Sequence, residues 1–382
     1  MMIRKILAKN LLNYQGFKTP RKCIVLESDD WGSIRMPSRD VFEFLMKKGV
    51  PVETCPYSKN DSLASEDDLS LLFELLSSIR DVHGSHPVIT ANVVVGNPDF
   101  EKISKSDFEE YYHEPFTETL SRYPKHGNSF NLWKEGMGKG LFYPQFHGRE
   151  HVNVAYWMRE LKEVSSLMRE LFEYQCWSNL VQSRKKINIQ ASYDTEHPAE
   201  IEQHKAIIGD GLALFKKIFG FRSRSFIANN FIYHSDLNES LKNHGVDIIQ
   251  GMKYQKIPIL GKTKRGMSRH YTGEKNHLGQ HYLVRNCVFE PSQKPDDFDN
   301  VGECLNDISN AFFWKKPAII SIHRLNFVGY LRTENRDRNL KLFRELLKEI
   351  MKRWPDVEFM SSVQLGEYIK SGAVRSQEVT SA

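Results

Sequence analysis

Short apolar runs recur along the whole chain, and segments with a different periodicity separate most of them. The runs are rich in β-branched and aromatic residues, a composition typical of buried strands. They cover residues 23–27, 88–95, 141–146, 187–192, 225–228, 246–249, 283–289, 318–322 and 357–360. We therefore expect a strand at each of these places.

Segments between these runs carry apolar residues three and four positions apart, the spacing of an amphipathic helix. Examples are LSLLFELLSSIR after Asp68, AYWMRELKEVSSLMRELFEYQCW from Ala155 and NLKLFRELLKEIMKRW from Asn339. Strands that alternate with helices predict an α/β fold with a mainly parallel sheet. Roughly eight such units favour a barrel that is closed or nearly closed. A doubly wound open sheet is the alternative, but no GxGxxG follows the first strand.

The domain organisation follows from where these elements begin and end. We expect an N-terminal extension over residues 1–22, one barrel domain over 23–372 and a C-terminal tail over 373–382. The stretch 97–140 holds many aromatics and glycines and reads as a long irregular insertion. Loops of that length in a compact domain are usually functional or inserted.

The composition is that of a globular protein, and its charge is mild. Of the 382 residues, 40% are hydrophobic and 26% charged, and the net charge is +5. This balance gives no continuous basic face, so we expect no nucleic-acid partner. The most basic stretch, residues 253–269, reads first as a solvated loop and second as a phosphate-binding one.

Cysteine usage and the first residues bear on location. The chain has five cysteines without CxxC spacing, which argues against a disulfide scaffold or a cysteine-based zinc site. The start, MMIRKILAKNLLNYQG, lacks the apolar segment of a secretion signal. No window approaches the ~20 apolar residues of a transmembrane helix. We expect a cytoplasmic protein.

Polar groups follow several predicted strands, at the end of a barrel where active sites are assembled. Asp29 and Asp30 follow the first run, His147 ends the third, and His323 ends the run PAIISIH. Weaker candidates, each equally suited to capping a turn, are Asn92, Asp194, His197, Asn229 and Asn230. Trp31, Trp133 and Trp157 could stack on a sugar ring, although core packing is the commoner use of tryptophan.

The motif HGREH sets His147 and His151 four residues apart, a spacing that suits two ligands of one divalent cation. Asp30 would complete a site of two imidazoles and one carboxylate with a position open for water. Such a metal lowers the pKa of its water and polarises a carbonyl. Asp29 would then serve as general base and His323 as general acid. Taken alone, the two aspartates also fit a helix N-cap.

The ordered set ESDDWGS, HGREH and SIHRLNF resembles the polysaccharide deacetylases of the NodB-homology family. The resemblance implies that Asp29 is the base, that Asp30, His147 and His151 hold the metal, and that His323 is the acid. It implies zinc as the first choice of metal, with cobalt or nickel as alternatives. It also implies a deformed (β/α) barrel of about seven strands that removes an N-acetyl, less often an O-acetyl, group from a sugar.

The chain departs from the family pattern in two places. The stretch RSRSFIANNF lacks the prolines that usually accompany the arginine motif, and Arg224, with Arg222 as the alternative, is expected to orient Asp29. No Asp-Trp element that would tune the acid histidine is recognisable near VDIIQG. Together with the missing export signal, these departures favour a biosynthetic precursor, nucleotide-linked or lipid-linked, over a finished wall polymer. We expect a deacetylase of surface-polysaccharide or O-antigen assembly, working near the inner face of the membrane, whose basic stretch could meet a diphosphate.

Two other functions compete with this one. HGREH also matches the inverted zinc-peptidase motif HxxEH, in which Glu150 would be the base. That motif normally lies within a long helix and would give Asp29 and Asp30 no role. The other alternative is a barrel that binds glycans without catalysis, which would have no need of a base, an acid and a metal together.

Overall fold

A curled sheet of parallel strands forms the centre of the protein. The computed structural model describes residues 10–164, 166–177 and 188–379. Its main sheet has nine strands in the order β10-β7-β6-β5-β2-β1-β12-β11, and the ninth, β13, pairs with the first half of β1. The strands are β1 (Lys22–Trp31), β2 (Ile89–Val94), β5 (Phe142–Gly148), β6 (Ser225–Phe226), β7 (Ile248–Gly251), β10 (His281–Val284), β11 (Cys287–Val288), β12 (Ala318–His323) and β13 (Val357–Met360).

The two ends of this sheet are joined by one short segment, residues 281–289. Its first half, β10, pairs with β7, and its second half, β11, pairs with β12. Between them the backbone N–H of Arg285 donates to Gly251 (2.9 Å) and that of Asn286 to Ile319 (3.1 Å). The segment therefore brings opposite ends of the sheet together, and the fold is the deformed (β/α) barrel that the sequence predicts.

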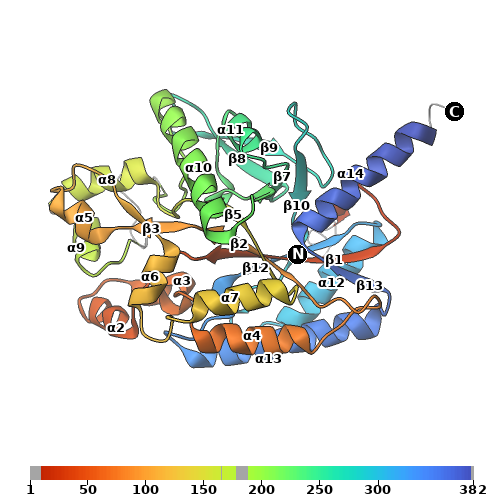
Figure 1. The fold of residues 1–382 in the computed structure, drawn as a ribbon. Coiled ribbons are helices and arrows are strands. Elements are labelled where there is room, and N and C mark those ends of the chain that lie inside the picture. Colours follow the sequence, from red (N-terminus) through yellow and green to blue (C-terminus); the bar gives the residue numbers. More distant parts are fainter. Residues whose placement is uncertain (1–9, 165, 178–187, 380–382) are drawn as a thin grey trace.

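Helices cover the outside of the barrel. Figure 1 shows α4, α7 and α13 on one side of the sheet and α10 and α11 on the other. The helices are α2 (Arg39–Lys47), α3 (Pro56–Asn60), α4 (Glu66–Ser77), α5 (Phe100–Lys105), α6 (Phe116–Arg122), α7 (Ser129–Gly138), α8 (Val154–Lys162), α9 (Leu167–Glu173), α10 (Pro198–Phe219), α11 (Leu237–Asn243), α12 (Asn300–Phe313), α13 (Thr333–Arg353) and α14 (Ser362–Val379). None of the helices in the described ranges is long and apolar enough to cross a bilayer.

Two small antiparallel sheets lie outside the barrel. The first joins β3 (Gly96–Pro98) to β4 (His113–Pro115), and the second is the hairpin of β8 (Tyr254–Pro258) and β9 (Arg265–Arg269). The expectation that 97–140 is irregular is wrong, because β3, α5, β4, α6 and α7 occupy most of it. Its aromatics serve packing: the tilted rings of Phe116 and Trp133 pack together with their centroids 4.9 Å apart.

Three other local expectations need correction. Of the predicted strand 187–192, residue 187 lies outside the described ranges and the rest forms turns. The predicted strand 283–289 is split at Arg285 between two partners. The long helix expected from Ala155 is two helices, because the side chain of Ser166 accepts from the N–H of Arg169 and starts a new one, α9.

The sheet is buried on both faces, as parallel sheets are. Every residue of β2 is buried, and Ile24 and Leu26 of β1 belong to the large core cluster inside the helical layer. Val25, Ile248 and Ile319 belong to a second cluster on the opposite faces of their strands. Both sides of the strands are thus held by apolar packing, which fixes the positions of the polar residues at the strand ends.

Candidate metal centre and acid–base pair

A bulge at the end of β1 separates the directions of two successive carboxylates. The pairing of β1 with β2 shifts between Ser28 and Trp31, and Asp30 has a left-handed backbone with φ of 74°. Gly32 also has a positive φ, and a Cβ there would lie 2.3 Å from the carbonyl oxygen of Val94. Bulges re-aim side chains in this way next to functional sites. Asp29 and Asp30 consequently meet different partners.

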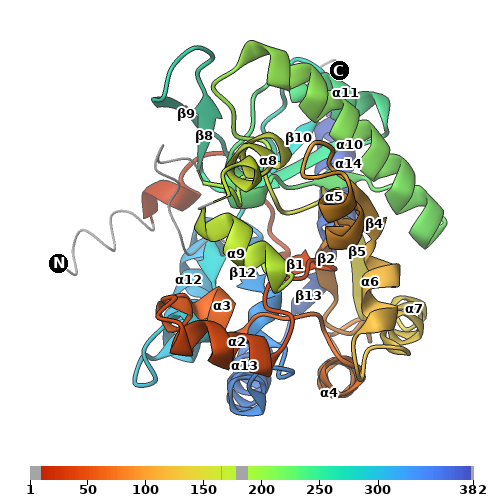
Figure 2. The ribbon, with the colours of Figure 1, turned by 90° about the vertical axis from the view of Figure 1, so that its left-hand side faces the viewer.

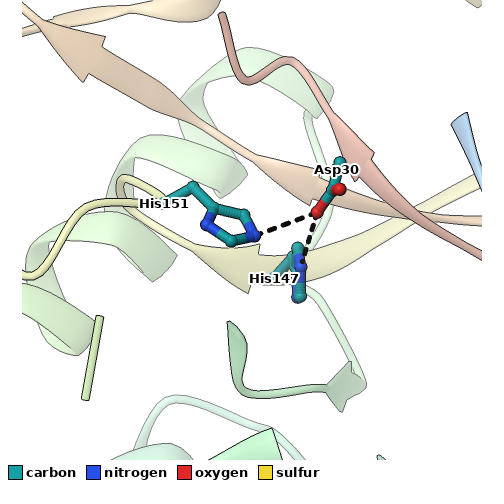
Figure 3. A group of neighbouring side chains, drawn as sticks. All are labelled: Asp30, His147 and His151. Carbon is teal, nitrogen blue, oxygen red and sulfur yellow. Dashed lines mark ion pairs between the residues drawn. The ribbon is translucent and has the colours of Figure 1, made fainter. Parts of the chain in front are cut away.

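Asp30 meets the two histidines of HGREH. Its Oδ1 lies 3.0 Å from Nε2 of His151 and 3.3 Å from Nε2 of His147 (Figure 3). His147 is the second-last residue of β5, and His151 lies in the bend that follows. One ligand atom from each residue lies within 4.8 Å of the other two, and all three side chains are buried. The structure thus brings together the three residues that the sequence proposes as metal ligands.

The hydrogen bonds of this group suit metal ligands. Nδ1–H of His147 donates to the carbonyl oxygen of Ile227 (2.9 Å), which leaves the lone pair of Nε2 directed at Asp30. Burial first, and the neighbouring Arg35 second, lower the pKa of His151 to about 4, so its imidazole is neutral at pH 7. Nε2 of His147, without a hydrogen in this tautomer, can bind a cation beside the carboxylate of Asp30. The donor set therefore fits a divalent metal ion.

Arg35, which the sequence analysis did not single out, touches two of the three candidate ligands. Its Nη2 lies 3.0 Å from Oδ2 of Asp30 and 3.2 Å from Nε2 of His151. Its Nε is 2.9 Å from Asp61, and the rings of Tyr57 and Trp177 lie against its guanidinium. One lone pair of His151 cannot both accept from Arg35 and bind a metal. Arg35 is therefore a built-in competitor for the cation.

Asp29 is held by a buried arginine. Nη2 and Nη1 of Arg285 donate to its two oxygens at 2.6 and 2.7 Å, and Nδ2 of Asn92 donates to Oδ1 at 2.7 Å. Burial would raise the pKa of Asp29, but the charge and hydrogen bonds of Arg285 outweigh it and bring the pKa to about 2. Oδ1 thus has two donors and Oδ2 only one. The remaining lone pair of Oδ2 is available for a proton.

His323 lies on that side of Asp29. Its Nε2 is 3.7 Å from Oδ2 of Asp29, and its Nδ1 is 2.5 Å from Oε1 of Glu290. Burial lowers the pKa of His323, but the Glu290 carboxylate outweighs this and raises it to about 9. The other oxygen of Glu290 accepts from Nδ2 of Asn326 (2.7 Å), so the carboxylate is fixed in place. At neutral pH an ionised acceptor thus faces a protonated donor.

The expectation that Arg224 orients Asp29 is wrong. Nη2 of Arg224 is occupied outside the barrel by Asp247 (3.0 Å) and Glu367 (2.7 Å). The contact to Asp29 comes from Arg285, because the closing segment 281–289 carries its side chain into the barrel. The sequence contained one indication of this contact, because Arg285 is the only charged residue in the apolar run 283–289. Glu290, which is far from VDIIQG in the sequence, provides the carboxylate beside His323.

The weaker candidates divide between the site and other roles. Asn92 lies in the site, as described above. Asp194 forms a two-pronged ion pair with Arg265, and His197 occupies the N-cap position of α10 without a side-chain cap bond. Asn229 is fully buried, and Asn230 is exposed with a φ of 56°.

The tryptophans considered for sugar stacking belong to the core. Trp31, Trp133 and Trp157 are all buried, and Nε1 of Trp31 donates to Oγ of Ser28 (2.9 Å). The ring of Trp31 packs edge-on against Trp133 at a centroid distance of 5.9 Å. None of the three is therefore placed to contact a sugar.

Glu150, the base of the peptidase alternative, is engaged elsewhere. Its Oε2 lies 2.6 Å from Nε of Arg149. Residues 147–151 form the end of β5 and a bend, not the interior of a helix. The helical arrangement on which an HxxEH peptidase site depends is therefore not formed.

Comparisons with known proteins give distant matches of fold only. No family model and no curated protein matches the chain. A solved structure from Mycobacterium smegmatis, assigned as a polysaccharide deacetylase, is similar with a TM-score of 0.45, 9% identity and 94% of each chain covered. Puue allantoinase is similar with a TM-score of 0.44 and 10% identity, over 94% of this chain and 95% of that one. A 4-alpha-glucanotransferase from Thermococcus litoralis gives 0.45 and 8%, over 90% of this chain and 40% of that one.

Proposed function

We propose that this protein is a metal-dependent hydrolase that removes an acetyl group from an N-acetylated sugar. One observation carries the proposal. Asp29, whose pKa is low, and His323, whose pKa is raised, lie 3.7 Å apart. They adjoin the buried group of Asp30, His147 and His151.

Asp29 and His323 divide the proton transfers between them. The free lone pair of Asp29 Oδ2 accepts the proton of the attacking water. His323, protonated at neutral pH, donates from Nε2 to the leaving nitrogen of the amide. Arg285 and Glu290 keep the two groups in these opposite protonation states, since environments that push two pKa values apart assign acid and base.

Asp30, His147 and His151 would hold the metal. A divalent ion there would polarise the acyl carbonyl and lower the pKa of water, which matters because a carboxylate with a pKa of about 2 is a weak base. Zinc suits two imidazoles and one carboxylate, with cobalt or nickel as alternatives. The side chain of Arg35 must leave His151 for the site to fill.

The substrate we propose is a precursor of surface polysaccharide or O-antigen, nucleotide-linked or lipid-linked, acted on in the cytoplasm. The resemblance of ESDDWGS, HGREH and SIHRLNF to polysaccharide deacetylases supports the sugar. The side chain of His323 is 18% exposed, whereas those of the metal group are 3% exposed. This difference supports a substrate that approaches from the side of His323.

The test is a mass-spectrometric screen of zinc-loaded protein with acetylated nucleotide sugars and lipid-linked glycans, scored for loss of an acetyl group. Asp29→Asn should lower kcat by about 10²–10⁴-fold, the usual contribution of a general base. Glu150→Gln, the matched control, should retain most of the activity. The reverse pattern would support the peptidase alternative. Absence of both metal binding and turnover would favour a barrel that only binds glycans.

A further inference from the structure

A cationic and apolar surface lies on the hairpin of β8 and β9. The register pairs Tyr254 with Arg269 and Lys256 with Met267. Side chains two positions apart on a strand, and those directly opposite on its neighbour, share one face. All four side chains are exposed, whereas Gln255 between them is buried. We call these four residues, Tyr254, Lys256, Met267 and Arg269, the hairpin face.

The hairpin face is part of a wider basic region without acidic residues. Residues 253–269 contain six lysines and arginines and no aspartate or glutamate. Arg265 is paired with Asp194, but within the described ranges no ion pair engages Lys256, Lys262, Lys264 or Arg269. Unpaired cations on a protruding hairpin attract an anionic surface.

Exposed apolar residues of the N-terminal segment lie beside this hairpin. The side chain of Lys253 donates to the carbonyl oxygen of Leu11, and the backbone N–H of Phe17 donates to Thr272 at 2.7 Å. Leu11 is 59% exposed and Tyr14 is 61% exposed. Figure 2 shows this segment and the hairpin projecting from the same side of the molecule.

We propose that the hairpin face and the N-terminal segment bind the surface of an anionic lipid bilayer. Lysine and arginine stems lie along apolar surface while their charges reach the headgroups, and tyrosine prefers the same interfacial depth. Leu11 and Met267 add apolar contact without a spanning helix. The combination of cations with interspersed large apolar residues fits a headgroup layer better than it fits a nucleic acid, which offers no apolar phase.

The hairpin is tied to the candidate metal centre by a short series of contacts. Arg265 of β9 pairs with Asp194 at 2.6 Å, and Nδ2 of Asn153 donates to the carbonyl oxygen of Asp194 at 2.7 Å. In the same loop, Oγ of Ser192 donates to the carbonyl oxygen of Glu150, the neighbour of His151. Membrane binding therefore holds the HGREH side of the barrel near the lipid. Binding itself does not depend on the proposed chemistry.

The experiment is co-sedimentation of the full chain with vesicles at 0.15 M salt, one set of neutral phosphatidylcholine and one containing about a third phosphatidylglycerol. The unmodified protein should sediment with the anionic vesicles and remain free of the neutral ones. Lys256→Glu with Arg269→Glu should weaken the partition coefficient by at least about 25-fold, because each basic residue contributes about fivefold. Lys341→Glu with Lys348→Glu, at two exposed positions of α13, makes the same change of net charge and should leave binding unaltered.

A third variant separates insertion from simple attraction. Tyr254→Ser with Met267→Ser keeps every charge and should weaken binding by a smaller factor, about fivefold to tenfold, since two partly buried side chains are lost. The proposal is overturned if the unmodified protein does not sediment with the anionic vesicles. It is also overturned if the α13 variant loses binding as fully as the hairpin variant, which would show an effect of net charge alone.

Discussion

The pairing of His323 with Glu290 makes the stability of this protein depend on pH in a predictable way, and Glu290→Gln tests it. The substitution keeps the size of the side chain and an oxygen that can accept from Asn326, but removes the negative charge 2.5 Å from Nδ1 of His323. The pKa of His323 is about 9 against an ordinary value of 6.5. A difference of about 2.5 units corresponds to roughly 3 kcal/mol at 1.36 kcal/mol per unit.

The sign follows from the direction of the shift. A histidine whose pKa is raised on folding adds stability that is fully present below pH 6.5 and disappears as pH rises through about 9. At pH 6 the free energy of unfolding should therefore be about 3 kcal/mol lower for Glu290→Gln than for the unmodified protein. At pH 10 the shortfall should be close to zero, because His323 is neutral there in both proteins.

Urea unfolding at a series of pH values, with metal removed, measures this difference. Glu345→Gln, an exposed change of the same charge on α13, is the control and should show a difference within about 0.5 kcal/mol at every pH. A shortfall of similar size at pH 6 and pH 10 would refute the reasoning, since it would show lost packing and no charge pairing. If His323 is the general acid of the proposed hydrolase, the rate should decline above about pH 9 and that of the variant at a lower pH.

Two further substitutions test the arginines of the site. Arg285→Met leaves Asp29 and Glu27 buried without a cation, so urea unfolding at pH 7 should show a loss of about 3–5 kcal/mol in the free energy of unfolding. Arg224→Met, at a half-exposed ion pair, should lower it by less than about 1 kcal/mol. Equal losses would contradict the assignment of Arg285. Arg35→Met removes the competing cation and should strengthen zinc binding by about tenfold or more in a chelator competition; weaker binding would show that Arg35 supports the metal site.

Local patterns in the sequence predicted the parts of the site that depend on neighbouring residues. Asp29 and Asp30 adjoin one another at a strand end, and HGREH sets its histidines within one turn, so short-range spacing was enough to propose them. Their burial and approach could not be read from spacing. Arg35 was missed because it follows the bulge in an irregular segment that carries no periodicity.

Arg285 and Glu290 were missed because their positions depend on barrel closure. The sequence of residues 283–289 predicts one apolar strand. In the structure this segment changes its pairing partner from β7 to β12. Which side chain enters the barrel at such a crossing depends on pairings with strands far away in the sequence. Arg224 was a reasonable choice by position in the family pattern, but it precedes the two-residue strand β6 and its side chain remains outside.

The closing segment 281–289 links the candidate site to the folding of the newly made chain. Arg285 lies within this segment and Glu290 directly follows it, so the contacts that hold Asp29 in place and keep His323 protonated form only once the two ends of the sheet have met. A chain still folding, or one that has opened along this seam, carries all the motif residues yet has neither an ionised base held in place nor a charged acid. The acid–base pair is therefore assembled by barrel closure, and its formation reports that folding is complete.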